Sequence, residues 1–385
     1  MSEEESYQKF VDWLGKTWWS LTPSEQLMPL MKARYTIEAA EFLTGVPHSA
    51  ATLEDLAQLK GMDASELEPH LKKMCQQGLM YEIKRGSSVR YRLNDSYFVF
   101  FRSTFWPGTD DQTSKDTAPL ANKYFHDGFY EQYAPIHAKG LRALPIHATI
   151  DDTRKILPYE DVVKVLDKVE YFTVSTCPCR QRQKLDDDGN KCDKLLSVCL
   201  HFDELGHYIV DNGMGREITR EETEKILKTS ADAGLVHGIS NWQEKPDTIC
   251  NCCNCCCLWM EAYHKLGHHK SLDASNYTVQ VEEGTYKACG LCVKRCPMDA
   301  LQLKFSPKAG NKFNKAAVVF KEACIGCGVC AQVPDRFSDA GAEGKGFRST
   351  RECARLRNAL YGRPQEGGTA FKTIRMANTP EISVV

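Results

Sequence analysis

The chain has 385 residues, too many for one small domain, and its 42% hydrophobic and 26% charged residues are typical of a folded protein. Its 49 Lys and Arg against 51 Asp and Glu give a formal net charge of −2, which excludes a strongly basic chain that coats nucleic acid or an anionic membrane. The unusual feature is its 18 cysteines. They occur singly at 75 and 353 and in three groups, four at 177–199, six at 250–257 and six at 289–330.

The compartment decides how grouped cysteines are interpreted. The first residues, Met1–Ser6, are acidic and have no apolar stretch after them, so we expect no signal peptide. The sequence contains no run of about 18 apolar residues, so it predicts no membrane span. We therefore expect a cytoplasmic protein, in which grouped cysteines are more often metal ligands than disulfides.

The region 1–105 has helix and hairpin signals in a definite order. An apolar helical pattern ends near Gly45, Thr52 can cap a short helix, and Ser65 with Glu68 predicts a capping box. The expected helices are Ala33–Leu43, Thr52–Gln58 and Ser65–Gln77, followed by strands Leu79–Lys84 and Val89–Leu93. This order resembles a winged helix-turn-helix domain.

A winged helix can bind DNA or serve as a docking module. Residues 30–100 contain nine basic and nine acidic side chains, so this region has no excess of positive charge for binding phosphates. The basic residues of the expected wing are Lys84, Arg85, Arg90 and Arg92. We favour docking, because the fold alone does not fix the function. Nucleic acid is retained as an alternative partner.

The middle of the chain is expected to contain a connector and a mixed α/β domain. Residues 106–150 are rich in Pro, Asp, Thr and aromatic residues and predict a packed connector with a short aromatic helix. Within 151–275 we expect helix Tyr159–Val169, strand Tyr171–Ser175 and a helix from Thr219 to near Gly234. The fold class that follows is α+β: a winged-helix-like domain, a Cys-rich mixed α/β domain and a third Cys-rich domain.

That third domain, 276–335, has two cysteine motifs. The first contains Cys289, Cys292 and Cys296 before Pro297, and the second contains Cys324, Cys327 and Cys330. They resemble the two halves of a bacterial two-cluster 4Fe–4S ferredoxin, in which the fourth cysteine of each half ligates the cluster of the other half. The resemblance implies a ferredoxin-like domain with one complete 4Fe–4S cluster, on Cys296, Cys324, Cys327 and Cys330. Zinc is the alternative, but a tetrahedral zinc site has no use for a third closely spaced cysteine.

The second cluster motif is incomplete. Its leading cysteine position is Tyr286, and the fourth cysteine of the second half is replaced by Pro334. Only Cys289 and Cys292 remain as ligands for that cluster, and the sequence does not show whether they bind anything.

The break at Val333 suggests a change of reading frame. One codon set allowed by Val333–Ala340, with two nucleotides restored after Val333, encodes Val-Cys-Pro-Thr-Asp-Ser-Leu-Met, an ordinary ferredoxin continuation. We hypothesise that the chain after Val333, including the irregular tail 336–385 and Cys353, is read out of frame. Sequencing the gene across Val333 tests this, and an intact frame with other codons would refute it.

The ten cysteines between residues 177 and 257 form a second group. Ten thiols exceed the four that one cluster needs. Neighbouring cysteines of a run point in different directions, so the run can supply two centres. We favour at least one further iron–sulfur cluster over zinc, although the sequence does not assign the ligands. The candidates are Cys177, Cys179, Cys192, Cys199, Cys250, Cys252, Cys253, Cys255, Cys256 and Cys257.

The segment 140–260 also resembles a family of 4Fe–4S-binding proteins of anaerobes. The matching motifs are Cys177–Arg180, Gly234–His237 and Cys250–Cys257, and the resemblance implies electron transfer. His264 and His268 follow at i, i+4 on an expected helix from Leu258, a spacing that suits a metal but is more often solvated or capping.

These observations predict an electron carrier, or a subunit of an oxidoreductase, more than a stand-alone enzyme. Electrons would pass through 4Fe–4S clusters to a partner redox enzyme. Two alternatives are retained: a redox-sensing regulator that binds DNA through the winged helix, and an oxidoreductase with a substrate-binding cluster in the central domain. No Gly-rich phosphate motif supports a nucleotide site, and no nucleophile and base motif identifies catalytic residues.

Overall fold

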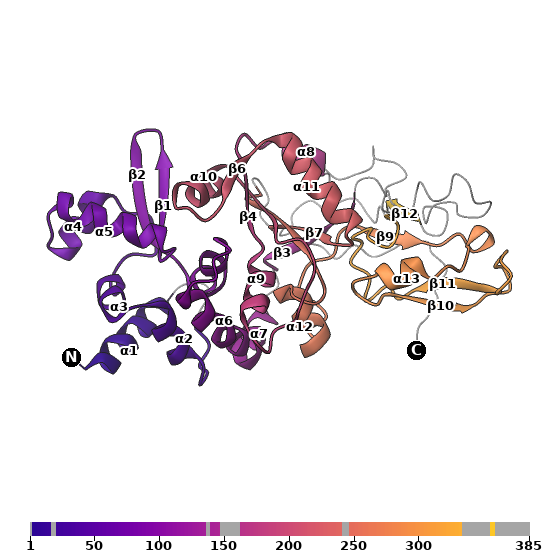
Figure 1. Ribbon diagram of the computed structural model, residues 1–385, viewed down its shortest axis with the longest axis horizontal. Helices are drawn as coiled ribbons and strands as arrows, with labels where there is room; N and C mark the ends of the chain where they lie inside the picture. Colours follow the sequence, from indigo (N-terminus) through magenta and orange to yellow (C-terminus); the bar gives the residue numbers. More distant parts are fainter. Residues whose placement is uncertain are drawn as a thin grey trace, which may run out of the picture. The chain divides into compact units, whose positions relative to one another are not determined.

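The computed structural model describes residues 2–16, 21–135, 139–146, 162–240, 246–332 and 355–358. The described chain is a mixed α and β protein. It divides into two compact units, each made of two segments (Figure 1). The first unit combines Met1–Ile136 with Tyr171–Thr219, and the second combines His137–Glu170 with Arg220–Val385. Of the tail expected at 336–385, only 355–358 lies within the described residues.

The first unit begins with helices followed by a β-hairpin. Its elements up to residue 93 are α1 (Glu3–Leu14), α2 (Leu27–Arg34), α3 (Ile37–Leu43), α4 (Leu53–Lys60), α5 (Ala64–Gln76), β1 (Met80–Arg85) and β2 (Ser88–Leu93). Strands β1 and β2 pair antiparallel, and an isolated antiparallel bridge joins Ala51 to Tyr91. The expected cap at Thr52 is confirmed, because its hydroxyl accepts the amide of Asp55 at 3.2 Å.

The expected capping box at Ser65 and Glu68 is wrong. Helix α5 begins at Ala64, and the carbonyl of Asp63 accepts the amides of Glu66 and Leu67 at 3.1 and 3.0 Å. Ser65 therefore already has helical backbone and cannot be the capping residue. The extent of the helix agrees with the prediction to within one residue at each end.

The stretch after the hairpin contains more helix than the sequence predicted. Its elements are the π-helical turns η1 (Phe98–Ser103) and η2 (Phe125–Phe129), with α6 (Gln112–Tyr124) and α7 (Tyr130–Tyr133). Aromatic side chains pack along it: the Phe98 and Trp106 rings meet edge to face at 5.2 Å, and those of Phe125 and Phe129 at 4.8 Å. The buried Arg182 guanidinium lies over Phe101 and Phe125, at 5.6 and 5.5 Å from their ring centres.

A three-stranded antiparallel group completes the first unit. Its elements are β4 (Phe172–Thr176), α9 (Pro178–Leu185), β5 (Ser197–Phe202), α10 (Asp203–Asp211) and β6 (Arg216–Ile218). Strand β4 pairs with both β5 and β6. Helix α10 lies beside strand β1 (Figure 1), where Tyr208 stacks on Tyr81 at 4.3 Å and its hydroxyl donates to the carbonyl of Met80 at 2.8 Å.

The second unit has a three-stranded antiparallel group of its own. Strand β7 (Val236–Ser240) pairs with β3 (Leu141–Leu144) on one side and β8 (Thr248–Cys252) on the other. The register places Val236 opposite Cys252 and Gly238 opposite Cys250. The accompanying helices are α8 (Val162–Leu166), α11 (Arg220–Asp232) and α12 (Leu258–Leu266). Of the helix expected at 159–169, only the five residues of α8 are helical, and residues 159–161 lie outside the described part.

The rest of the second unit is a small cysteine-containing region. Its elements are β9 (Tyr277–Gln280), η5 (Glu283–Thr285), α13 (Leu291–Arg295), β10 (Leu301–Phe305), β11 (Lys315–Val319) and β12 (Arg355–Asn358). Strands β10 and β11 form an antiparallel hairpin, and β9 pairs with β12. Leu301, Ala316, Val279 and Tyr286 form its buried core. Among the helices described, none is long and apolar enough to cross a membrane.

Candidate metal centre

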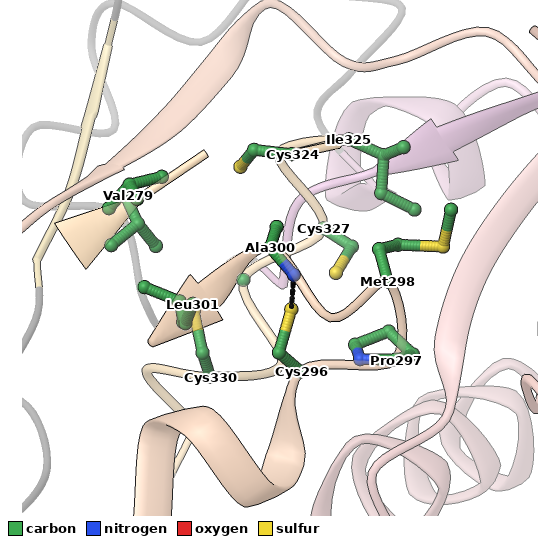
Figure 2. Close-up of a pocket in the computed structure, with 13 residues that line it drawn as sticks. Val279, Cys296, Pro297, Met298, Ala300, Leu301, Cys324, Ile325, Cys327 and Cys330 are labelled. Carbon is green, nitrogen blue, oxygen red and sulfur yellow. Dashed lines mark hydrogen bonds between the residues drawn. The ribbon is translucent and has the colours of Figure 1, made fainter. Parts of the chain in front are cut away.

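Four of the cysteines expected to hold a cluster surround one pocket. Cys296 follows α13, and Cys324, Cys327 and Cys330 lie on the loop after β11, so two separate segments supply the thiols. Figure 2 shows the sulfur atoms of Cys296 and Cys327 turned toward each other, with Cys324 and Cys330 on the surrounding chain. The rest of the lining is mostly apolar, including Leu301 at the base of the hairpin.

Hydrogen-bond donors point at the sulfur atoms of this pocket. The backbone amide of Ala300 donates to Cys296 Sγ at 3.3 Å (Figure 2), and the Thr278 hydroxyl donates to Cys324 Sγ at 3.8 Å. Such N–H and O–H groups stabilise negative charge on sulfur, and hydrogen bonds to sulfur tune the potential of iron–sulfur centres. The pocket is therefore suited to hold thiolates.

Burial has the opposite effect on the same thiols. It raises the pKa of Cys296, and the backbone amides of Met298 and Ala300 partly offset this rise. Burial also raises the pKa of Cys327 and of Cys330. A buried thiol gains most from becoming a thiolate when a cation lies beside it, so metal binding here is coupled to proton release.

The loop that carries three of these cysteines needs glycine. Gly326 has φ of +67° and Gly328 has φ of +77°, a conformation that other residues adopt at a cost. A Cβ atom on Gly326 would also lie 2.2 Å from the hydroxyl oxygen of Ser275 and 2.2 Å from the carbonyl oxygen of Tyr277. The glycines thus let the chain turn tightly enough for its cysteines to face one pocket.

The remaining two cysteines of this region have different surroundings. Cys289 is exposed, whereas Cys292 is completely buried. The side chain of Tyr286, at the position where the ferredoxin motif has a cysteine, is also buried, and its hydroxyl lies 2.9 Å from Cys292 Sγ. Cys292 and Tyr286 both belong to the hydrophobic core. The sequence showed that a ligand was missing here, but not that an aromatic ring is packed in its place.

The central cysteines include a compact group in the second unit. The sulfur atoms of Cys253, Cys255 and Cys256 lie within 4.8 Å of one another. A tetrahedral ion with metal–sulfur bonds of about 2.3 Å holds its sulfurs roughly 3.8 Å apart, so this group could bind a metal or an iron–sulfur cluster after small adjustments. Cys253 and Cys256 are buried and Cys255 is half-buried. Cys192 is half-buried and belongs to the first unit.

The other thiols of the run have different neighbours. Cys252 is hydrogen-bonded to Cys250 and Cys257, and these two bonds, together with burial, raise its pKa. Cys256 is hydrogen-bonded to Cys253 and Cys255, which with burial raises its pKa in the same way. Cys257 occupies the N-cap position of α12, where its side chain makes no capping hydrogen bond.

Three further candidates lie on the first unit, outside the compact group. Cys177 is buried at the N-cap of α9, and Cys179 is half-buried in the first turn of that helix. Cys199 is buried on β5, opposite Ser175 of β4. Arg180 and Arg182, on the same helix as Cys179, are almost completely buried.

The two histidines considered as metal ligands do not share a helix. Helix α12 ends at Leu266, and Gly267 follows with φ of +65°, so His268 lies beyond the helix. His264 Nε2 donates instead to the carbonyl of Pro297 at 2.8 Å, next to Cys296. No sequence pattern predicts this contact, because it joins residues 33 positions apart.

Comparison with known proteins adds no assignment. No family model, curated protein or solved structure matches the chain.

Proposed function

We propose that this chain is an iron–sulfur electron-transfer protein that passes electrons through 4Fe–4S clusters to a partner redox enzyme. The observation that supports this most directly is the pocket formed by Cys296, Cys324, Cys327 and Cys330. Their spacing in the sequence is that of a complete ferredoxin cluster site, and amide and hydroxyl donors point at the sulfurs of two of them. A bound cluster would supply one-electron chemistry at this pocket.

A route between the pocket and the central cysteines supports transfer through more than one centre. Helix α12 begins beside Cys257, and its seventh residue, His264, donates to the carbonyl of Pro297. Seven residues of helix span about 10 Å. A centre on the Cys250–Cys257 run and a cluster at Cys296 would therefore lie at the two ends of one short helix.

The hairpin β10–β11 suggests the kind of partner. Between Leu301 and Lys321 the sequence has five lysines and no carboxylate. Phe305 and Phe313 are 74% and 53% exposed. The base of the hairpin lines the pocket through Leu301 and Val319. A basic surface with exposed aromatic rings beside a redox centre favours an acidic redox partner.

The compartment and the chemistry are consistent in this proposal. The cysteines of the described residues are thiols rather than disulfides, as in the reducing cytoplasm. We leave Cys289 and Cys292 out of the proposed cluster site, because Tyr286 takes the place of a ligand and bonds to Cys292.

The alternative of a DNA-binding regulator has less support. The helices α3 to α5 with the β1–β2 hairpin suit a winged-helix-like domain, but the basic residues of the wing are partly neutralised within the chain. Lys84 pairs with Asp211 at 2.7 Å, and Arg85 pairs with Glu204 at 3.0 Å. Both acidic partners belong to α10 and would compete with phosphates. Salt-dependent duplex binding that changes on oxidation would favour the regulator.

The alternative of an oxidoreductase depends on a centre with an open coordination position. A metal bound by three cysteines of the central run would favour it, because three cysteines leave a fourth position to another ligand. Reduction or oxidation of a substrate without any partner protein would support this function.

The first experiment is to purify the full chain without oxygen and to measure iron, acid-labile sulfide and zinc per chain. We expect at least four irons and four sulfides, with a 4Fe–4S electron paramagnetic resonance signal on reduction. Cys327→Ser should remove that complement. A chain with zinc but no sulfide, or one whose iron does not depend on Cys327, would contradict the proposal.

A further inference from the structure

Arg295 directly precedes the proposed ligand Cys296 and contacts the segment that carries another proposed ligand. Its Nε donates to the carbonyl oxygen of Val329 at 3.1 Å, and Val329 is the residue before Cys330. Cys296 and Cys330 line the same pocket from separate segments of the chain (Figure 2). One side chain therefore joins the two segments, at a point immediately beside a ligand in each.

The carbonyl of Val329 depends on this contact. Val329 is 0% exposed, so its oxygen cannot bond to water. The turn that follows is closed by the preceding carbonyl instead, because Gly328 accepts the amide of Gln332 at 3.2 Å. Since a peptide group is planar, a donor that fixes the Val329 oxygen also fixes the amide of Cys330. Arg295 thereby sets the orientation of the backbone at Cys330.

The other nitrogens of the Arg295 guanidinium are bound to the end of helix α11. Nη2 donates to the carbonyl of Ala231 at 3.0 Å, and Nη1 donates to that of Asp232 at 3.4 Å. These are the last two residues of the helix, where carbonyls have no partner within the helix and the dipole favours a cation. The carboxylate of Asp232 also accepts Nε2 of Gln332 at 3.0 Å, two residues after Cys330. The end of α11 thus holds the cysteine loop at two points.

The chain turns next to this guanidinium. Gly234 has φ of +80°, and the amide of Leu235 donates back to the carbonyl of Ser230 at 2.9 Å, in a turn that leads from α11 into β7. A Cβ atom on Gly234 would lie 4.0 Å from Arg295 Nη2. Strand β7 pairs with β8, which leads into the Cys250–Cys257 run. The turn therefore links the cluster loop to the strand pair that begins this run.

We propose that Arg295 is a positioning residue of the cluster pocket: its forked side chain fixes Cys330 against the end of α11, and its positive charge raises the reduction potential of the bound cluster. This inference rests on the proposed function, since it takes Cys296 and Cys330 as cluster ligands. A planar guanidinium serves several carbonyls at once, whereas the ammonium of lysine is a compact point charge. A positive charge beside the cluster stabilises the reduced form, which carries one more electron.

Three variants of the full chain separate the clamp from the charge. Arg295→Lys keeps the charge but not the fork, Arg295→Gln removes both, and the control Lys294→Gln removes a charge from the exposed neighbouring side chain. We expect both Arg295 variants to lose the cluster to an iron chelator several-fold faster than the wild type. Only Arg295→Gln should also lower the midpoint potential, by about 59 mV if the ratio of reduced to oxidised cluster changes tenfold.

The control sets the outcomes that contradict the proposal. Lys294→Gln should match the wild type in cluster lifetime and shift the potential less than Arg295→Gln does, because solvent and salt screen an exposed charge. Wild-type cluster lifetimes in both Arg295 variants would overturn the clamp. Equal potential shifts in Arg295→Gln and Lys294→Gln would overturn the effect assigned to the Arg295 charge.

Hydrogen exchange of the metal-free chain tests the clamp without a cluster. We expect the amides of 329–332 to exchange faster in Arg295→Lys than in the wild type or in Lys294→Gln, because the loop is no longer held to α11. Strands β7 and β8 should exchange slowly in all three proteins, which shows that each is folded. Equal exchange of the loop in all three would refute the clamp. The iron and sulfide content of the wild type reports on the proposed function separately.

Discussion

Cys292 and Cys296 lie four residues apart, beside the same hydrophobic core, and differ in their polar neighbours. Cys296 faces the pocket and accepts the amide of Ala300, whereas Cys292 is buried in a hydrophobic core beside Tyr286. The same motif thus contains one thiol placed for a metal and one placed for packing. The difference comes from Tyr286, which occupies the space of the missing ligand.

The first prediction compares these two thiols. Cys296→Ala should abolish the cluster, because it removes one of four ligands. Cys292→Ala should retain full iron and sulfide and lose about 1 kcal/mol of unfolding free energy, as small truncations in a core do. Iron content and denaturant unfolding check both. Loss of iron in Cys292→Ala would show that Cys292 is a ligand.

The second prediction concerns Gly326. Gly326→Ala combines a positive φ with two contacts of 2.2 Å, so we expect a loss of about 2 kcal/mol or more and a reduced cluster content. Gly284→Ala is the control, because a Cβ there would meet nothing within 4 Å. Thermal unfolding and iron content are the measurements. Equal behaviour of the two variants would contradict the role given to the Gly326 loop.

At the scale of elements, the β10–β11 hairpin combines two tasks. Its base lines the cysteine pocket, and its outer part presents lysines and aromatic rings to solvent. Lys304 lies over the ring of Phe320 at 5.1 Å, and Lys312 lies over that of Phe313 at 5.0 Å. The outer part of the hairpin is thus cationic.

The third prediction follows from that charge. Lys304→Glu with Lys312→Glu should slow oxidation of the reduced protein by the anionic iron–EDTA complex by several-fold, and should speed its oxidation by cationic hexaamminecobalt. The differences should shrink at high salt. Stopped-flow absorbance measures the rates, and Lys115→Glu, on α6 of the other unit, is the control. Rates that do not depend on the sign of the probe would show that the hairpin does not guide electron exchange.

At the scale of the whole molecule, buried histidines make folding depend on pH. Burial lowers the pKa of His237 to about 4, with a smaller opposing effect from its bond to Asn251. The unfolded chain has an ordinary histidine with a pKa of about 6.5. Between these values the unfolded state binds more protons than the folded state, so stability falls as pH decreases from about 6.5 toward 4.

The fourth prediction uses this linkage. His237 alone can account for a loss of up to about 3 kcal/mol across that range. His237→Gln should therefore lose less stability between pH 7 and pH 5 than the wild type does, while the exposed His70→Gln should behave like the wild type. Guanidinium unfolding at the two pH values measures the loss of stability in each of the three proteins. Acid effects on the metal sites are common to all three, so they cancel in the comparison. Identical pH dependence in all three proteins would exclude His237 as a source.

The sequence by itself determined much of the local structure. Helices α4, α5 and α11 and strands β1, β2 and β4 lie close to the expected ranges, because caps, glycines and short apolar periods are local signals. The helix expected at Ala33–Leu43 is wrong in its first part, because the chain is extended at Tyr35 and Thr36 and α3 begins only at Ile37. It missed most of α6, η1 and η2, since their aromatic residues follow no clear period and fold by packing on one another. The grouping of the cysteines, and with it the expectation of a metal site, was also readable from spacing alone.

Only the tertiary structure decided which thiols meet. It placed Cys296 beside the loop of Cys324 and Tyr286 beside Cys292. It also built each compact unit from two segments far apart in the sequence. The physical reason is that ligand spacing along a chain limits which cysteines can share a metal, whereas a strand face, a turn and a helix N-terminus decide where each sulfur atom points.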